Sequence, residues 1–193
     1  MELDKCIKGR RSVRDYLEKD VENEKLVKII DSARYAPSSG NLQNWRFIIV
    51  KDNKKRNDIA IACLKQHWMA EAPVHIVVCN KIEDVKRFYG SMGELVYSIH
   101  NCAAAIENLL LTAYSLGLGT CWIGAFDEDA IKKILRIPND IKIEAVITVG
   151  YPKEKEEPAE RYSLDNLTFF EEWGEYAKDK TQMSKPKLFK RLF

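Results

Sequence analysis

The chain has 193 residues, 46% of them hydrophobic, and its 31 basic residues nearly balance 29 acidic ones, for a net charge of +2. This length fits one globular domain with a sizeable core, and the near-neutral charge argues against a surface built mainly to bind nucleic acid. No stretch approaches the roughly 18 apolar residues of a membrane helix, and the first ten residues lack the apolar core of a secretory signal. We therefore expect a cytoplasmic protein that binds neither membrane nor nucleic acid.

Three arginines lie close together near the start, in the segment RRSVR at 10–14. If this segment is extended, Arg10, Ser12 and Arg14 share one side, whereas Arg11 and Val13 take the other. Arg10 and Arg14 then lie about 13 Å apart, at roughly 3.3 Å per residue. This spacing suits an elongated ligand with a phosphate at one end and an electron-rich group at the other. The alternative is a solvated basic loop.

Helical and extended patterns alternate after this segment. A helix is predicted over 22–36, where apolar residues recur at helical spacing before Pro37 ends it. A buried strand follows at 45–51, then a helix over 52–68 and a second strand at 74–80. These elements predict helices packed on a sheet.

The most apolar segment runs from about Ser91 to Leu116 without a proline. It predicts a long helix that is apolar on more than one face and needs burial on both sides. A short strand at 119–126, a helix over 127–137 and a third convincing strand at 141–152 complete the pattern.

Beyond Tyr151 the chain becomes a charged, proline-punctuated linker, followed by a tail that contains Phe169, Phe170 and Trp173. Large aromatic side chains are costly to leave in water, so this arm should lie on another surface. We divide the chain into one domain over 1–164 and a C-terminal extension over 165–193, whose basic end is interpreted as a solvated tail.

Cysteine and histidine spacing gives no sign of a metal or a disulfide framework. The five cysteines form no CxxC pair and mostly lie in apolar runs, as reduced core thiols do. The three histidines have no partner at ligand spacing, so no structural metal is expected.

A second polar cluster, APSSGNLQNW at 36–45, exposes amides and hydroxyls of the kind that read the edge of a polar heterocycle. Taken with RRSVR, GLGTCWIG, IPNDIKIEAVITVGYP and ERYSLDN, in this order and spacing, it resembles the nitroreductase family of FMN-dependent oxidoreductases. The resemblance implies a three-layer α+β fold, with a central mixed sheet flanked by helices. It also implies a homodimer with the long helix at its interface, the C-terminal arm on the partner subunit, and two FMN sites shared between the chains.

The resemblance assigns the basic residues to two ends of the cofactor. Arg10 and Arg161 correspond to phosphate ligands, with Arg11 and Ser12 beside them. Arg14 corresponds to the basic residue near N1 and O2 of the flavin ring.

Two further segments match the family's flavin contacts. Ile123 and Gly124 correspond to the backbone that faces flavin N5. The loop lent by the partner chain corresponds to four residues: Pro37, Ser38, Ser39 and Asn41.

Some positions depart from the family pattern. Asn44 stands where proline is usual and Asn101 where aspartate is common, and RYS at 161–163 replaces an arginine–lysine pair. No basic counterpart for a further ring contact is found around Trp68. These departures concern details of the pyrimidine-side contacts.

The chemistry expected from such a site depends on electrostatics. FMN accepts a hydride at N5 and spreads negative charge onto N1 and O2, so a fixed cation there favours reduction. Arg14 is the predicted stabiliser, and no other catalytic side chain is predicted. NADH or NADPH should enter as a transient donor, because the glycines of GLGTCWIG lack the GxGxxG spacing and follow a helix.

We therefore predict an FMN-dependent oxidoreductase that passes hydride from NAD(P)H to a small flat acceptor, such as a nitroaromatic or a quinone. The alternatives are a flavin store or sensor without turnover, and a deiodinating or flavin-fragmenting branch of the family. Phe88, Tyr89 and Met92 are candidates to cover a flat substrate, although ordinary helix packing explains them equally well. The sequence identifies neither the acceptor nor the preferred nicotinamide.

Overall fold

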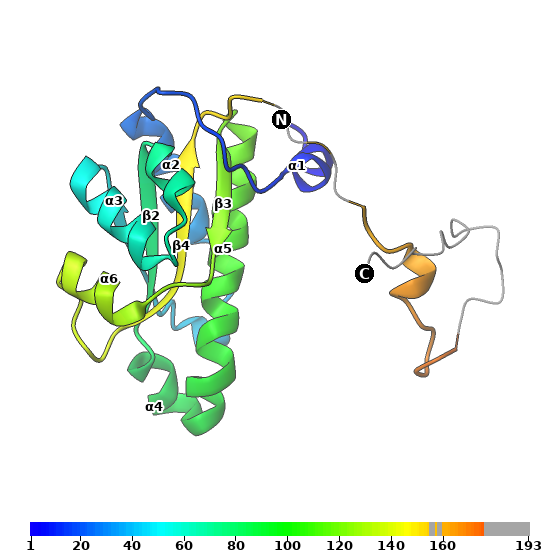
Figure 1. The fold of residues 1–193 in the computed structure, drawn as a ribbon. Helices are drawn as coiled ribbons and strands as arrows, with labels where there is room; N and C mark the ends of the chain where they lie inside the picture. Colours follow the sequence, from blue (N-terminus) through cyan, green and yellow to red (C-terminus); the bar gives the residue numbers. More distant parts are fainter. Residues whose placement is uncertain (155–156, 158–159, 176–193) are drawn as a thin grey trace. The chain divides into compact units, whose positions relative to one another are not determined.

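A computed structural model describes residues 1–154, 157 and 160–175 of the chain. The chain divides into two compact units, Met1–Glu156 and Glu157–Phe193. The sheet and the α-helices named below all belong to the first unit (Figure 1). This boundary precedes the predicted one at residue 164, and packing of 165–193 on a partner subunit stays a prediction.

The four strands form one sheet in the order β1-β2-β4-β3: β1 Trp45–Val50, β2 Val74–Asn80, β3 Gly119–Ile123 and β4 Lys142–Gly150. All three neighbouring pairs are antiparallel. Every residue of β2 is buried, because its side chains face helices on both sides of the sheet. Within the described residues, the sheet is therefore antiparallel and not mixed as predicted, and the parallel bridge between Ser12 and Thr120 is an isolated one beside β3.

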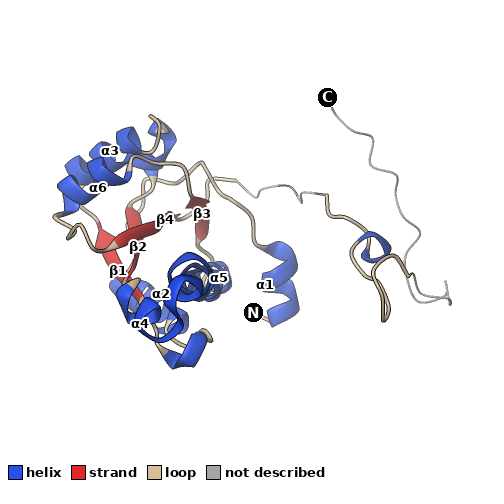
Figure 2. Cartoon of the chain, turned by 90° about the horizontal axis from the view of Figure 1, so that it is seen from below, coloured by secondary structure: helices blue, strands red, loops and turns tan. Residues whose placement is uncertain are grey.

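Two helices cover one face of the sheet, α2 (Asn23–Ala33) and α5 (Ser98–Ser115) (Figure 2). Ile29 of α2 and Leu109 of α5 are fully buried against this face. Burying a side chain of this size stabilises the fold by about 1.5–3 kcal/mol. Both helices were predicted, because their apolar residues recur at helical spacing.

The opposite face is covered by α3 (Asn53–Ala62) and α6 (Glu128–Leu135) (Figure 2). Both helices begin at an aspartate: the Asp52 carboxylate accepts from the Lys55 N–H, and the Asp127 carboxylate accepts from the Ala130 N–H. Such caps satisfy backbone donors that a helix start leaves open. With helices on both faces of the sheet, the predicted three-layer α+β fold is confirmed.

All five cysteines are buried and unbridged, as predicted. Burial raises the pKa of Cys63 and Cys102 to about 12 and that of Cys79 to about 11. Burial also raises the pKa of Cys121, although the Arg14 cation and the Ser12 hydroxyl act in the opposite direction. A raised pKa keeps these thiols protonated near neutral pH, and a thiol is reactive only when it is deprotonated. They therefore act as core side chains and not as nucleophiles.

One helix prediction was wrong in its extent. The helix expected over 52–68 ends at Ala62, and Leu64 and Lys65 have positive φ before a short 3-10 helix at His67–Glu71. Leu64 and Lys65 carry no sequence signal for that conformation, so this end was not visible in the residue types.

The long helix expected from about Ser91 to Leu116 is confirmed, since the backbone is helical without interruption from Ser91 to Ser115. α4 (Glu83–Met92) has a break at Gly90, a π-helical turn spans Gly93–Tyr97, and α5 follows. A side chain on Gly93 would lie 2.6 Å from the Val85 carbonyl oxygen, so glycine permits this close approach.

The N-terminal helix α1 (Leu3–Gly9) was not predicted from the sequence. In the second unit, a 3-10 turn spans Leu164–Asn166, and the rings of Phe169 and Trp173 lie 4.7 Å apart. The predicted basic end at 185–193 lies outside the described residues.

Candidate functional site

The segment after α1 lies along the edge of β3. The Val13 N–H donates to the Thr120 carbonyl at 2.9 Å, and Ser12 forms the parallel bridge to Thr120. Val13 is buried and lies against Gly119, where a side chain would clash with it. Ser12 and Arg14 are exposed, so the structure confirms that they alternate with Val13.

Arg10 lies at the end of α1 with an incompletely paired guanidinium. Its Nε is buried without a hydrogen-bond partner and lies 3.6 Å from the Glu107 carboxylate on α5. A hollow of about 330 Å³ adjoins it, lined by α1, the start of β3 and the chain after β4. A cation with an unused donor beside a hollow can bind an anion.

Arg11 lies beside Arg10 but has a different role in the local structure. Its Nη1 donates to the Lys8 and Arg10 carbonyl oxygens, at 2.7 Å each. The guanidinium therefore caps the C-terminal end of α1, where carbonyls lack helical partners.

Arg14 lies over the ring of Trp68, with its guanidinium carbon 5.8 Å from the ring centre. This is a cation–π contact, which restrains a side chain that is otherwise exposed. Trp68 belongs to the 3-10 helix His67–Glu71, whose Met69 carbonyl accepts from the buried His75 Nε2 at 2.8 Å. The sequence analysis missed Trp68 as a partner of Arg14, because no local pattern joins residues so far apart.

The second cluster is the loop between α2 and β1, where a 3-10 turn spans Ser39–Asn41. Gly40 and Asn41 both have φ of 56°, a conformation that glycine and asparagine adopt more readily than other residues. The Ser38 hydroxyl accepts from the Gln43 N–H at 3.1 Å. Pro37 through Asn41 thus form one tight turn after α2.

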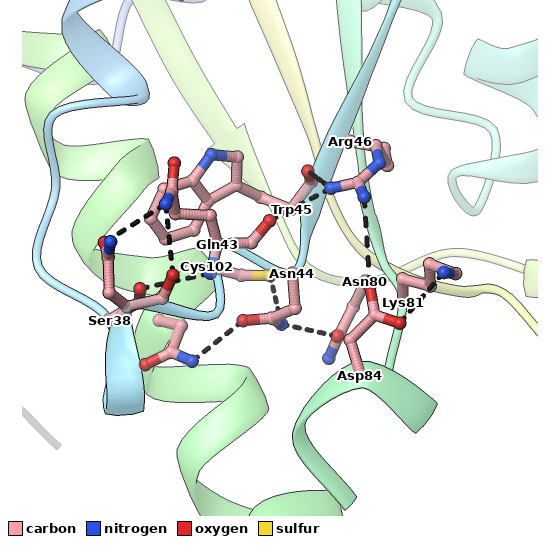
Figure 3. Close-up of polar contacts among 11 residues, drawn as sticks. Ser38, Gln43, Asn44, Trp45, Arg46, Asn80, Lys81, Asp84 and Cys102 are labelled. Atoms are coloured by element: carbon pink, nitrogen blue, oxygen red, sulfur yellow. Dashed lines mark hydrogen bonds and ion pairs between the residues drawn. The ribbon is translucent and has the colours of Figure 1, made fainter. Parts of the chain in front are cut away.

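Buried amides hold this loop against α5 and β2. Asn101 on α5 accepts from the Ser39 N–H at 3.0 Å and from its hydroxyl at 3.3 Å. Asn101 donates to Asn44, which donates in turn to Asn80 of β2. Figure 3 shows Asn44 between Cys102 of α5 and Asn80. The sequence analysis identified Asn44 and Asn101 only as departures from the family pattern.

One of the three predicted cover residues, Tyr89, lies next to this loop. Phe88 and Met92 are 66% and 49% exposed, so neither is an ordinary core residue of the single chain. The Tyr89 hydroxyl lies 2.8 Å from where a side chain on Gly40 would begin, and its ring packs edge-on against Tyr97. Tyr89 is therefore the cover candidate that the structure places against the loop.

The remaining predicted residues are divided between the two units. Ile123 ends β3 with its side chain buried, and nothing lies within 4 Å of a side chain placed on Gly124, so a ligand can approach that backbone. Arg161 belongs to the second unit, where it donates to the Glu160 carbonyl at 3.3 Å. Its place beside Arg10 stays a prediction.

The two clusters contact opposite parts of α5 (Figure 1). Gly9, next to Arg10, lies against Tyr114 near the C-terminal end of α5, whereas Ser39 contacts Asn101 near its start. These two contacts are about 20 Å apart along the helix axis, at 1.5 Å per residue. The structure thus brings Arg10, Ser12 and Arg14 together and Ser38, Ser39 and Tyr89 together, as two separate groups.

No helix in the described part of the chain is long and apolar enough to cross a membrane. Over the same residues, no group of three or more histidine, cysteine, aspartate or glutamate side chains is arranged to hold a metal ion.

Comparison with known proteins identifies the family. The model of the nitroreductase family matches residues 7–66 and 60–151. An Archaeoglobus fulgidus protein, provisionally named NADH dehydrogenase/NAD(P)H nitroreductase, is 32% identical over 86% of this chain and 97% of its own length. A Bacillus subtilis FMN reductase [NAD(P)H] is 27% identical over 80% of this chain and 67% of its own length.

The fold leads to the same family. A nitroreductase family protein from Clostridium novyi superposes with a TM-score of 0.74 at 31% identity, covering 91% of this chain and 97% of that one. The fold and the matches together define an oxidoreductase. The chain belongs to the nitroreductase family, as the sequence motifs predicted.

Proposed function

We propose that this chain binds FMN and passes hydride from NADH or NADPH to a small flat acceptor. The observation that carries the proposal is the arginine segment: Arg10 has an unused donor beside a hollow, and Arg14 lies further along the same exposed edge. The names of the relatives support a flavin and a nicotinamide, since one is an FMN reductase [NAD(P)H].

The residues present fit FMN. Arg10 would bind the phosphate, with Ser12 beside it, because charge-assisted hydrogen bonds are the strong ones. Arg11 would contribute indirectly, because it caps the end of α1 and so helps to hold the backbone of Arg10 in place. Arg161 is the second proposed phosphate ligand.

When bound, FMN would supply the hydride chemistry. Arg14 would place a permanent positive charge beside the pyrimidine side of the ring, where negative charge develops on reduction. Trp68 restrains the Arg14 guanidinium and so limits its reorganisation. The backbone at Ile123 and Gly124 would face the reacting edge, since Gly124 leaves room for close approach.

We further propose that the chain is a cytoplasmic homodimer and that each site combines the arginine segment of one chain with the loop Pro37–Asn41 of its partner. The separation of the two clusters along α5 supports this arrangement. Because Tyr89 lies beside Gly40, the cover residues Phe88, Tyr89 and Met92 would come from the chain that lends the loop.

Anaerobic titration tests the proposed function. The purified protein should be yellow or take up micromolar FMN, and NADH or NADPH should then bleach the flavin absorbance. A colourless protein that takes up no FMN would overturn the proposal. A bound flavin that neither nucleotide bleaches would favour a flavin store or sensor instead. Recovery of the yellow colour on adding a nitroaromatic, a quinone or an iodinated phenol would then identify the acceptor class.

A further inference from the structure

A one-way chain of hydrogen bonds runs from the Ser39 loop into the sheet. The Ser39 N–H and hydroxyl donate to Asn101 Oδ1, and Asn101 Nδ2 donates to Asn44 Oδ1 at 2.8 Å. Asn44 Nδ2 donates to Asn80 Oδ1 at 2.7 Å, and Asn80 Nδ2 donates to the Glu144 carboxylate at 2.7 Å. A second acceptor for Asn44 Nδ2 is the Ser98 carbonyl at 3.0 Å.

Burial fixes the direction of this chain. Asn44 and Asn80 are fully buried, and Asn101 is 4% exposed, so water cannot replace a lost partner. The Ser98 carbonyl and the Glu144 carboxylate can only accept, so the amide nitrogens of Asn44 and Asn80 must face them. Turning the Asn44 amide over would place its oxygen against two acceptors and leave those buried groups unsatisfied, which is unfavourable.

The fixed amide of Asn44 decides which way Asn101 can face. Because Asn44 presents its oxygen, Asn101 must present its nitrogen, and its own oxygen is left for Ser39. A carboxylate at position 101 could still accept from Ser39 but would place a negative oxygen against Asn44 Oδ1. The two departures from the family pattern are thus in contact and depend on each other.

We propose that Asn101 is a positioning residue for the Ser39 loop and that Asn44 acts through it by setting the orientation of its amide. This inference rests on the proposed function, because the loop then forms part of an FMN site. Neither asparagine needs to touch the cofactor. The Ser39 hydroxyl, whose proton is directed to Asn101, is left as an acceptor toward the ligand.

Asn101→Asp tests the proposal through pH. A protonated aspartic acid can donate one hydrogen bond and accept others, as Asn101 does toward Asn44 and Ser39, whereas the carboxylate has no donor. Burial should raise the pKa of the carboxyl group that this substitution introduces. The variant should therefore bind FMN as wild type does at about pH 5.5 and roughly tenfold more weakly at about pH 8.5, on the scale of one buried unsatisfied group. Wild-type affinity should change far less over that range.

Asn108→Asp is the matched control. Asn108 lies on the same helix, and its Nδ2 donates to the Ser32 carbonyl of α2 at 3.2 Å, away from the loop. This variant loses the same kind of donor and should be less stable, but its FMN affinity should follow wild type at each pH. A pH-dependent affinity in both variants would show a general loss of stability and overturn the positioning role.

A second variant tests the part played by Asn44. With Asn44→Ala added, the carboxylate of Asn101→Asp no longer faces an oxygen, so the double variant should bind FMN more tightly at pH 8.5 than the single variant does. Additive losses would overturn the dependence of one asparagine on the other. If wild type binds no FMN, the proposed function fails. If wild type binds FMN and Asn101→Asp matches it at every pH, the inference alone fails.

Discussion

The two halves of the proposed site are held by different kinds of contact. The segment Arg10–Arg14 is fixed by its backbone, which pairs with the edge of β3, while the side chain of Arg14 is exposed and that of Arg10 is partly buried. The loop Pro37–Asn41 is fixed by short side chains and buried amides. In the proposed site, the first half would therefore present charge that acts directly on a ligand, whereas the geometry of the second would depend on buried residues that need not touch it.

This difference separates two ways of damaging the site. Changes in the arginine half should act mainly through charge, because its cationic side chains are exposed or only partly buried. Changes behind the loop should alter position and stability together, because an unpaired buried amide costs free energy wherever it lies.

The largest effect expected tests whether the two halves act across chains. Arg10→Glu chains and chains carrying Ser39→Leu with Asn41→Leu should each be inactive alone. Unfolded and refolded together, they should recover about a quarter of wild-type activity. Half the dimers in a random mixture are mixed, and each mixed dimer has one intact site. A mixture that stays inactive would show that both halves come from one chain.

Within the arginine half, the charges should divide their roles. Arg14→Ala should keep much of its FMN yet lower the flavin potential and slow hydride uptake about 10²-fold, which corresponds to about 2.7 kcal/mol. Stopped-flow reduction and a redox titration measure both effects.

Arg10→Ala should instead lose FMN affinity, with little change in the potential of the flavin that stays bound. Arg11→Ala is the matched control, because its guanidinium faces backbone carbonyls, and it should lose less affinity than Arg10→Ala. Equal losses of affinity in the Arg10 and Arg14 variants, with unchanged potential, would contradict this division.

The smallest effect concerns His75, whose hydrogen bond to the Met69 carbonyl supports the 3-10 helix that contains Trp68. Burial, helped by the nearby Arg56 cation, lowers the pKa of His75 from 6.5 to about 4. The unfolded chain therefore binds the proton first, so stability is complete above about pH 6.5 and falls as the pH drops toward 4. Between pH 7 and pH 5 this group should remove about 2 kcal/mol from the free energy of unfolding.

Urea unfolding of wild type and His75→Gln at both pH values measures that loss. Glutamine can still donate to the Met69 carbonyl but does not titrate, so its stability should fall less over this range. Direct titration of the His75 ring by NMR in the folded protein gives an independent value. A ring that titrates near 6.5 would contradict the prediction.

Regular elements could be predicted where residue type dictates them. The second strand was predicted at 74–80, where β2 lies, because VHIVVCN is a short, mostly apolar run rich in β-branched residues. The end of α3 was not predictable, since Leu64 and Lys65 take a left-handed conformation that neither residue type favours. The break at Gly90 had a signal in the glycine itself, but the π-helical turn after it, at Gly93–Tyr97, had none in the residue types.

The same limit applies to the candidate site. The common side of Ser12 and Arg14 follows from the two-residue period of an extended chain, which the sequence shows directly. The contact of Ser39 with Asn101 joins residues 62 positions apart, and that of Arg14 with Trp68 depends on where a 3-10 helix lies. A single sequence carries no signal for such pairs, even when each residue alone attracts notice.

The burial of all five thiols has a practical consequence for studying this protein. Because the native cysteines are shielded from solvent, a cysteine introduced at an exposed position such as Phe88 becomes the preferred target of alkylating reagents. The wild-type background can then carry spin labels or fluorophores without first removing its own cysteines. One such label at position 88 of each chain would report the distance between the two covers of the proposed dimer, and its change when a ligand binds.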